Sequence, residues 1–125
     1  KMIFHSDAQK EADILSLTSN RRSHDRKLLE SWQQWQQQNP VSKASARNQF
    51  LAAAKFSITD KPRQPILIVT SQADHLVDYR CGRKLAQTWE TDYVQHETAG
   101  HDLPLDEPEW LAHVIKQWFD LQTGV

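Results

Sequence analysis

The stretch Pro65-Ile66-Leu67-Ile68-Val69-Thr70 decides the fold class of this chain. It is a short, continuous apolar run, it is rich in β-branched residues, and the chain enters it through a proline. Runs of this kind are typical of strands that are covered on both faces, as in a parallel sheet. The sequence therefore predicts a buried parallel strand at residues 65–70.

A helix and a second strand are expected directly after this run. Apolar residues recur at helical spacing from about Asp78 to Trp89, which predicts a helix. Its inner stripe consists of Val77, Cys81, Leu85 and Trp89. Because Cys81 lies on that stripe, we expect it to be a buried structural thiol. Residues 93–97 alternate between apolar and polar positions, which predicts the second strand.

The last helix is expected to begin at Asp106, because Glu109 three residues later completes a pattern similar to a capping box. Its inner stripe consists of Trp110, Val114, Trp118 and Leu121. Strand, helix, strand and helix joined by short loops form a βαβ unit with parallel strands, which places this part of the chain in the α/β class. Two strands alone do not make a stable sheet, so we expect further strands from upstream in a longer parent chain or from a second copy.

The residues before the run are predicted to form three helices, at about residues 8–17, 23–39 and 42–56. Ser23 and Ser42 are the expected N-caps of the second and third helices, and Asn39-Pro40 ends the second. The apolar stripe of the second helix is Leu28, Trp32 and Trp35, and the expected buried side of the third is Ala46, Phe50, Ala53 and Ala54.

Charge changes at the same place as the hydrophobic pattern. Residues 1–63 contain eleven Lys or Arg and six Asp or Glu, whereas residues 64–125 contain four and ten. We therefore place a boundary near Lys61-Pro62-Arg63, between a helical segment (residues 1–60) and a βαβα segment (residues 61–125). The basic half has no Arg-rich run and no aromatic ladder, which argues against nucleic-acid binding.

The composition is that of a globular domain, with 38% hydrophobic and 25% charged residues. No apolar run approaches the ~18–20 residues that a membrane span needs. The single cysteine excludes an internal disulfide and favours a reducing compartment such as the cytoplasm.

Each predicted strand is followed by a loop that carries a residue suited to catalysis. Asp74 lies in the loop at residues 71–77, and His101 lies in the loop at residues 98–106. In open parallel sheets, functional residues gather at the carboxyl ends of the strands. The carboxylate and the imidazole are therefore expected at the same edge of the sheet.

Both loops resemble parts of the α/β-hydrolase superfamily. The apolar run followed by Ser71-x-x-Asp74-x-x-Val77 resembles the strand and loop that carry the family's acid, and Gly100-His101-Asp102 resembles its histidine loop. The longer pattern Ala99-Gly-His-Asp-Leu-Pro-Leu-Asp-x-Pro-x-Trp110 is similar to that of lipase- and esterase-like members. The resemblance covers residues 65–121, and residues 8–56 only loosely resemble the variable cap segments of the family.

This resemblance implies a hydrolase that cleaves an ester, a thioester or a related bond of a small molecule. His101 would act first as general base and then as general acid, and Asp74 would accept a hydrogen bond from its ring. The family order of nucleophile, acid and histidine agrees with Asp74 preceding His101. The pattern implies no cofactor and no metal.

The nucleophile of such an enzyme is missing from the sequence. No Gly-x-Ser-x-Gly pattern occurs, and the three glycines are Gly82, Gly100 and Gly124. In the family the nucleophile and the oxyanion loop precede the acid, so we expect the chain to be the C-terminal part of a longer hydrolase and to be inactive alone. Two alternatives stay open: a non-catalytic module that self-associates, and a parent enzyme that uses Asp as its nucleophile.

Three further features of the sequence could suggest a metal site, a nucleophile or a lid, and the sequence favours none of these interpretations. A metal site made from His96, His101 and Asp102 matches no known ligand spacing. Ser71 lies in the acid loop without the geometry of a nucleophile elbow, so it is not a candidate nucleophile. Trp32 and Trp35 fit a helix that is buried against its neighbours better than a lid that holds acyl chains.

Overall fold

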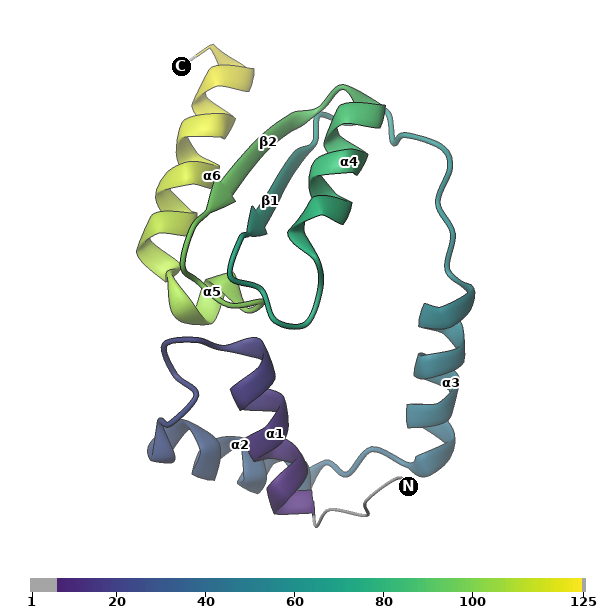
Figure 1. Cartoon of the computed structure of the whole chain (residues 1–125), viewed down its shortest axis with the longest axis vertical. Helices are drawn as coiled ribbons and strands as arrows, with labels where there is room; N and C mark the ends of the chain where they lie inside the picture. Colours follow the sequence, from purple (N-terminus) through teal and green to yellow (C-terminus); the bar gives the residue numbers. More distant parts are fainter. Residues whose placement is uncertain (1–6, 125) are drawn as a thin grey trace.

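The computed structural model describes residues 7–124, and a two-stranded parallel sheet lies at the centre of their second half (Figure 1). Strand β1 (Leu67–Ser71) pairs with β2 (Asp92–His96), with Val69 opposite Val94. The helix α4 (Tyr79–Trp89) makes the crossover between them. The mixed α/β class and the parallel pairing predicted from the apolar run are thus confirmed.

The helices α4 and α6 (Pro108–Thr123) lie on opposite faces of the sheet (Figure 1). On the α4 face, a Cβ atom on Gly82 would stand 2.6 Å from the Thr70 methyl and 3.5 Å from that of Ile68, so the missing side chain allows the helix to approach β1 closely. On the other face, Trp118 of α6 donates a 2.7 Å hydrogen bond from Nε1 to the Asp92 carboxylate at the start of β2.

The α4 helix differs from its prediction in the direction that it faces. Its N-cap is Asp78, whose side chain accepts a hydrogen bond from the Arg80 amide. Cys81, however, is exposed, so the expected buried thiol is wrong. The buried position of the helix is Ala86. Small residues on the packed face bring the backbone of α4 close to the sheet and turn Cys81 outward.

The end of the chain contains two helices where one was predicted. A short helix α5 (Leu103–Asp106) precedes α6, and Pro108 is the first residue of α6. Because proline is favoured at the first helical position, the N-cap of α6 is Glu107, which makes no side-chain capping bond. The predicted start at Asp106 and its capping box are therefore wrong. The predicted inner stripe is wrong at its end, since Leu121 is 81% exposed.

Helices α1 (Asp7–Thr18) and α2 (Arg26–Gln38) pack against each other below the sheet (Figure 1). Leu15 of α1 is fully buried. The N-cap of α2 is Asp25, whose carboxylate accepts the Leu28 amide, so the prediction of Ser23 as the cap is wrong by two residues. Residues 18–22, the last residue of α1 and the start of its connection to α2, hydrogen-bond to the loop that follows β2. We call this segment the elbow.

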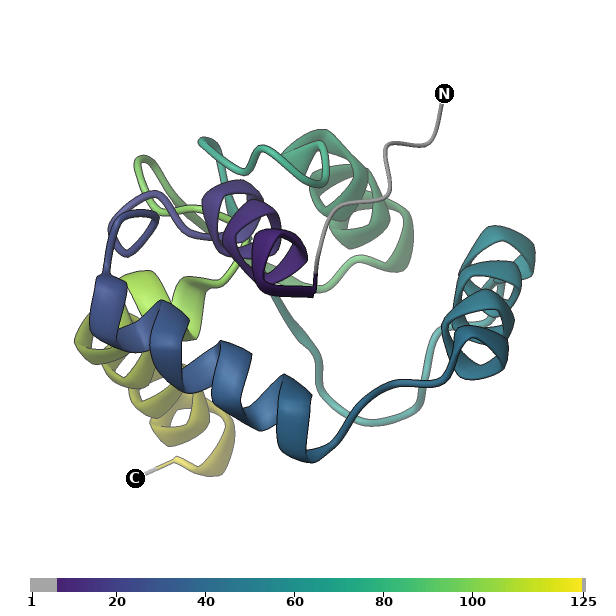
Figure 2. The ribbon, with the colours of Figure 1, turned by 90° about the horizontal axis from the view of Figure 1, so that it is seen from below.

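Helix α3 (Lys43–Lys55) stands apart from the other helices in both views (Figures 1 and 2). Its N-cap is Ser42, as predicted. The expected buried side of this helix is wrong: every residue from 37 to 65 is exposed, and Phe50 is 74% exposed. No helix within residues 7–124 is long and apolar enough to cross a bilayer.

Candidate active site

Asp74 and His101 meet at the carboxyl end of the sheet. Asp74 lies three residues after the end of β1, and His101 lies five residues after the end of β2. The Nδ1 atom of His101 is 2.8 Å from Oδ2 of Asp74, which is hydrogen-bonding distance. We call this pair the dyad. Because the two strands are parallel neighbours, their following loops leave the sheet at the same edge and bring the two side chains together.

The Asp74 carboxylate is fixed by the backbone of its own loop. Its second oxygen, Oδ1, accepts hydrogen bonds from the amides of Leu76 at 2.8 Å and Val77 at 2.9 Å. Partial burial by itself would raise the pKa of Asp74, but the bonds from Val77, His101 and Leu76 outweigh it and hold the pKa below its ordinary value. Asp74 is therefore a carboxylate at neutral pH, oriented toward the imidazole.

The His101 ring has a second nitrogen that its hydrogen bond to Asp74 does not use. An ionised carboxylate can only accept, so the hydrogen bond to Asp74 requires a proton on Nδ1 of His101. The Nε2 atom of a neutral ring then carries a lone pair. Within residues 7–124 the ring makes no other hydrogen bond, and its side chain is 41% exposed, against 11% for Asp74. This is the arrangement of a general base that is oriented by a carboxylate.

A small pocket of about 210 Å³ extends from the dyad along β1. It is lined by β1, by the first turn of α4, and by the side chains of Asp74, His101 and Leu103. Within the described residues β1 pairs only with β2, so the opposite edge of β1 is unpaired beside this pocket. A reacting group placed there would lie beside the dyad.

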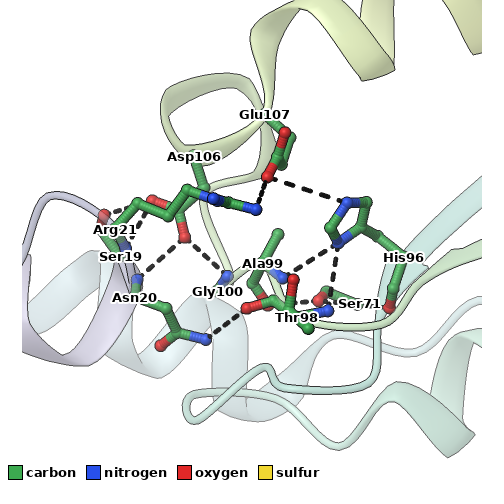
Figure 3. A network of polar contacts seen from close by, with 10 residues as sticks. All are labelled: Ser19, Asn20, Arg21, Ser71, His96, Thr98, Ala99, Gly100, Asp106 and Glu107. Carbon is green, nitrogen blue, oxygen red and sulfur yellow. Dashed lines mark hydrogen bonds and ion pairs between the residues drawn. The ribbon is translucent and has the colours of Figure 1, made fainter.

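The histidine loop is braced from β1 and from within itself (Figure 3). The buried hydroxyl of Ser71, at the end of β1, donates to the Ala99 carbonyl. The His96 Nδ1 atom accepts the amides of Thr98 at 3.2 Å and Ala99 at 3.0 Å. Its ring also makes an edge-on contact with Trp110 at a centroid distance of 4.7 Å. His96 thus holds the loop in shape.

Asp106 connects the histidine loop to the elbow (Figure 3). Its carboxylate is buried and accepts the Gly100 amide at 2.7 Å, the Asn20 amide at 2.9 Å and the Ser19 hydroxyl. A second link joins Asp102, whose amide donates to the Thr18 carbonyl at 2.8 Å. Beside this network Arg21 pairs with Glu107, at the N-terminus of α6. The elbow is therefore part of the structure that supports His101.

Sequence reasoning assigned these supporting residues other roles. The sequence pattern indicated no long-range contact for Ser19 or Asn20, and it placed Asp106 at the start of the last helix. For Asp106 a usable signal existed, because Pro108 at the first helical position makes residue 107 the N-cap and frees Asp106 for another role. Nothing in the local sequence indicated the role of Asn20.

The proposed metal ligands do not form a site in the part of the chain that the structure describes. No group of three His, Cys, Asp or Glu side chains there could hold an ion. His96 uses Nδ1 within its own loop, and the Asp102 carboxylate accepts the Leu105 amide at the start of α5. His101 is engaged with Asp74 instead.

No family model, no curated protein and no solved structure matches the chain. The functional argument therefore depends on the geometry of the dyad, on its surroundings and on the motif pattern in the sequence.

Proposed function

We propose that this chain forms the C-terminal part of a serine-type α/β-hydrolase and supplies the acid and the histidine of its catalytic triad. The observation that carries the proposal is the 2.8 Å hydrogen bond between Asp74 and His101, at the carboxyl ends of two adjacent parallel strands. The ionised carboxylate and the second nitrogen of a partly exposed ring are what a general base needs to activate a hydroxyl group. The motif around Gly100-His101-Asp102 points to the same chemistry.

In this proposal His101 removes the proton of a serine hydroxyl as that oxygen attacks an acyl carbon. The same imidazolium then protonates the leaving group, and the steps repeat with water to release the acid. Asp74 keeps the ring in the tautomer with Nδ1 protonated and stabilises the imidazolium as it forms. The serine and the oxyanion donors come from a segment outside this sequence. The unpaired edge of β1 beside the pocket is a suitable place for that segment.

The test uses the protein isolated from cells that produce it naturally. An antibody against this chain recovers the protein, a fluorophosphonate probe labels it, and mass spectrometry gives the intact mass and the labelled residue. We expect a mass well above 14.5 kDa and a label on a serine outside the present sequence. In the same cells His101→Ala should slow labelling by about 10²–10⁴-fold, the usual contribution of a general base.

A native mass equal to that of this chain, with no labelled serine, would overturn the hydrolase proposal. Within residues 7–124 both edges of the sheet are unpaired and α3 is exposed, and these observations would then favour a non-catalytic module that self-associates. That alternative predicts that the purified chain forms a defined oligomer by light scattering. A compact monomer would contradict it.

A further inference from the structure

We infer that Asn20 is a positioning residue for the dyad: its side chain holds the acid loop and the histidine loop at the separation that the Asp74–His101 hydrogen bond requires. The catalytic meaning of this inference rests on the proposed function. The hydrogen bonds of Asn20 from which we argue are made within this chain.

The side-chain amide of Asn20 contacts both loops at once. Its Nδ2 atom donates to the Ala73 carbonyl at 2.9 Å and to the Thr98 carbonyl at 3.2 Å (Figure 3 shows the bond to Thr98). Ala73 immediately precedes Asp74, and Thr98 lies three residues before His101. A single NH₂ group, with its two hydrogens, thus connects the backbones that carry the acid and the base.

Asn20 is itself held in place on its backbone side. Its amide donates to Oδ2 of Asp106, the same oxygen that accepts the Gly100 amide next to His101. A Cβ atom on Gly100 would stand 2.7 Å from the Thr18 carbonyl oxygen and 2.9 Å from the Asn20 nitrogen. The elbow and the histidine loop are therefore in backbone contact, and Asn20 cannot move far without moving that loop.

The chemistry of the contact makes an amide the suitable side chain here. Both partners are carbonyl oxygens, which only accept, so the position requires a donor with two hydrogens. Alanine would remove both bonds, whereas serine could keep one of them. If Asn20 positions the dyad, these variants should change the ratio of the two tautomers of the His101 ring. If Asn20 contributes only to stability, they should lower the free energy of unfolding and leave the ring unchanged in the folded protein.

The experiment measures the tautomer of His101 in the full chain by long-range ¹H–¹⁵N NMR. Wild-type protein should show the Nδ1-protonated ring. In Asn20→Ala the ratio of the Nδ1-protonated to the Nε2-protonated form should fall by about 3- to 10-fold, the factor expected from weakening one hydrogen bond. Asn20→Ser should show a smaller fall. Asn48→Ala, at an exposed site on α3, is the matched control and should equal wild type.

The outcomes separate this inference from the proposed function. If the His101 ring of the wild-type protein lacks the Nδ1 proton, this result would contradict the dyad, and with it both the proposed function and the positioning role of Asn20. A wild-type ring with that proton, together with folded Asn20 variants that match Asn48→Ala, would overturn the positioning role alone. Circular dichroism reports whether each variant is folded. Loss of the fold in both Asn20 variants would show a general structural role and would also contradict the inference.

Discussion

Asp74 and His101 have the exposures that their proposed roles require. The carboxylate is largely covered and receives three hydrogen bonds, so its orientation is fixed by the protein. The imidazole is fixed on one side by Asp74 and open on the other. A covered acid and an accessible base allow a proton to be exchanged with a bound group while the ring keeps its tautomer.

Asp74→Asn tests the acid without removing its shape. An amide can still accept from the loop amides but no longer stabilises the imidazolium, so labelling of the native protein by the fluorophosphonate probe should slow by about 10²–10⁴-fold. Asp102→Asn is the matched control, since that carboxylate caps α5 and does not touch the ring; it should label within about twofold of wild type. Equal labelling rates for the two variants would show that the Asp74 carboxylate does not contribute to the reaction.

At the scale of the elements, the contact between α4 and β1 sets the position of the acid loop. The loop that carries Asp74 runs from the end of β1 to the start of α4, so a shift of the helix would move the carboxylate. The contact depends on Gly82, which lies directly over the methyl group of Thr70. The hydroxyl of Thr70 is 2.7 Å from the hydroxyl of Tyr93. The helix can approach the strand this closely because Gly82 has no side chain where it meets the Thr70 methyl.

A double-mutant cycle tests that contact. Gly82→Ala should lower the free energy of unfolding by about 1–3 kcal/mol, because the new methyl overlaps the Thr70 methyl. Thr70→Ser removes that methyl and keeps a hydroxyl for Tyr93, so the double variant should recover part of the loss. Urea denaturation of all four proteins gives the coupling energy. Strictly additive losses would mean that Gly82 matters for another reason.

At the scale of the whole molecule, the buried carboxylate of Asp106 links the helical elbow to the α/β part through its hydrogen bonds. Burial alone would raise the pKa of Asp106, but hydrogen bonds from the Ser19 hydroxyl and from the amides of Gly100, Asn20 and Arg21 hold it below its ordinary value of 3.8. The pKa of Asp74 is also lowered. The native state therefore favours both carboxylates in their ionised form.

This linkage predicts acid sensitivity. Well above the ordinary pKa of 3.8, at about pH 5 and higher, the ionised forms contribute their full stabilisation. As the pH falls through and below that value, the unfolded chain takes up protons first, and stability is lost until the folded pKa is passed. The free energy of unfolding should thus decrease from about pH 5 downward, and Asp106→Asn should flatten this decrease. Urea titrations at a series of pH values measure both, and an unchanged slope in Asp106→Asn would contradict the prediction.

Several local elements follow from residues that are close together in the sequence. The β-branched run at residues 65–70 predicted the strand that the structure shows at Leu67–Ser71, although most of its residues are only half-buried, and Ser42 was the predicted N-cap of α3. The order of Asp74 and His101 after two parallel strands also brought them to one edge of the sheet. These properties depend on residues close together in the chain, where spacing and backbone preference act directly.

Which helix faces are covered and which residues support the dyad depend on contacts between segments that are distant in the sequence. Cys81 and Phe50 lie on apolar stripes, yet both are exposed because burial depends on which neighbours are present. Asn20 reaches carbonyls 53 and 78 residues away, and Asp106 binds Ser19 across 87 residues. Such contacts leave no periodic trace in the sequence, because each side chain satisfies a hydrogen-bonding group that becomes its neighbour only when the chain folds.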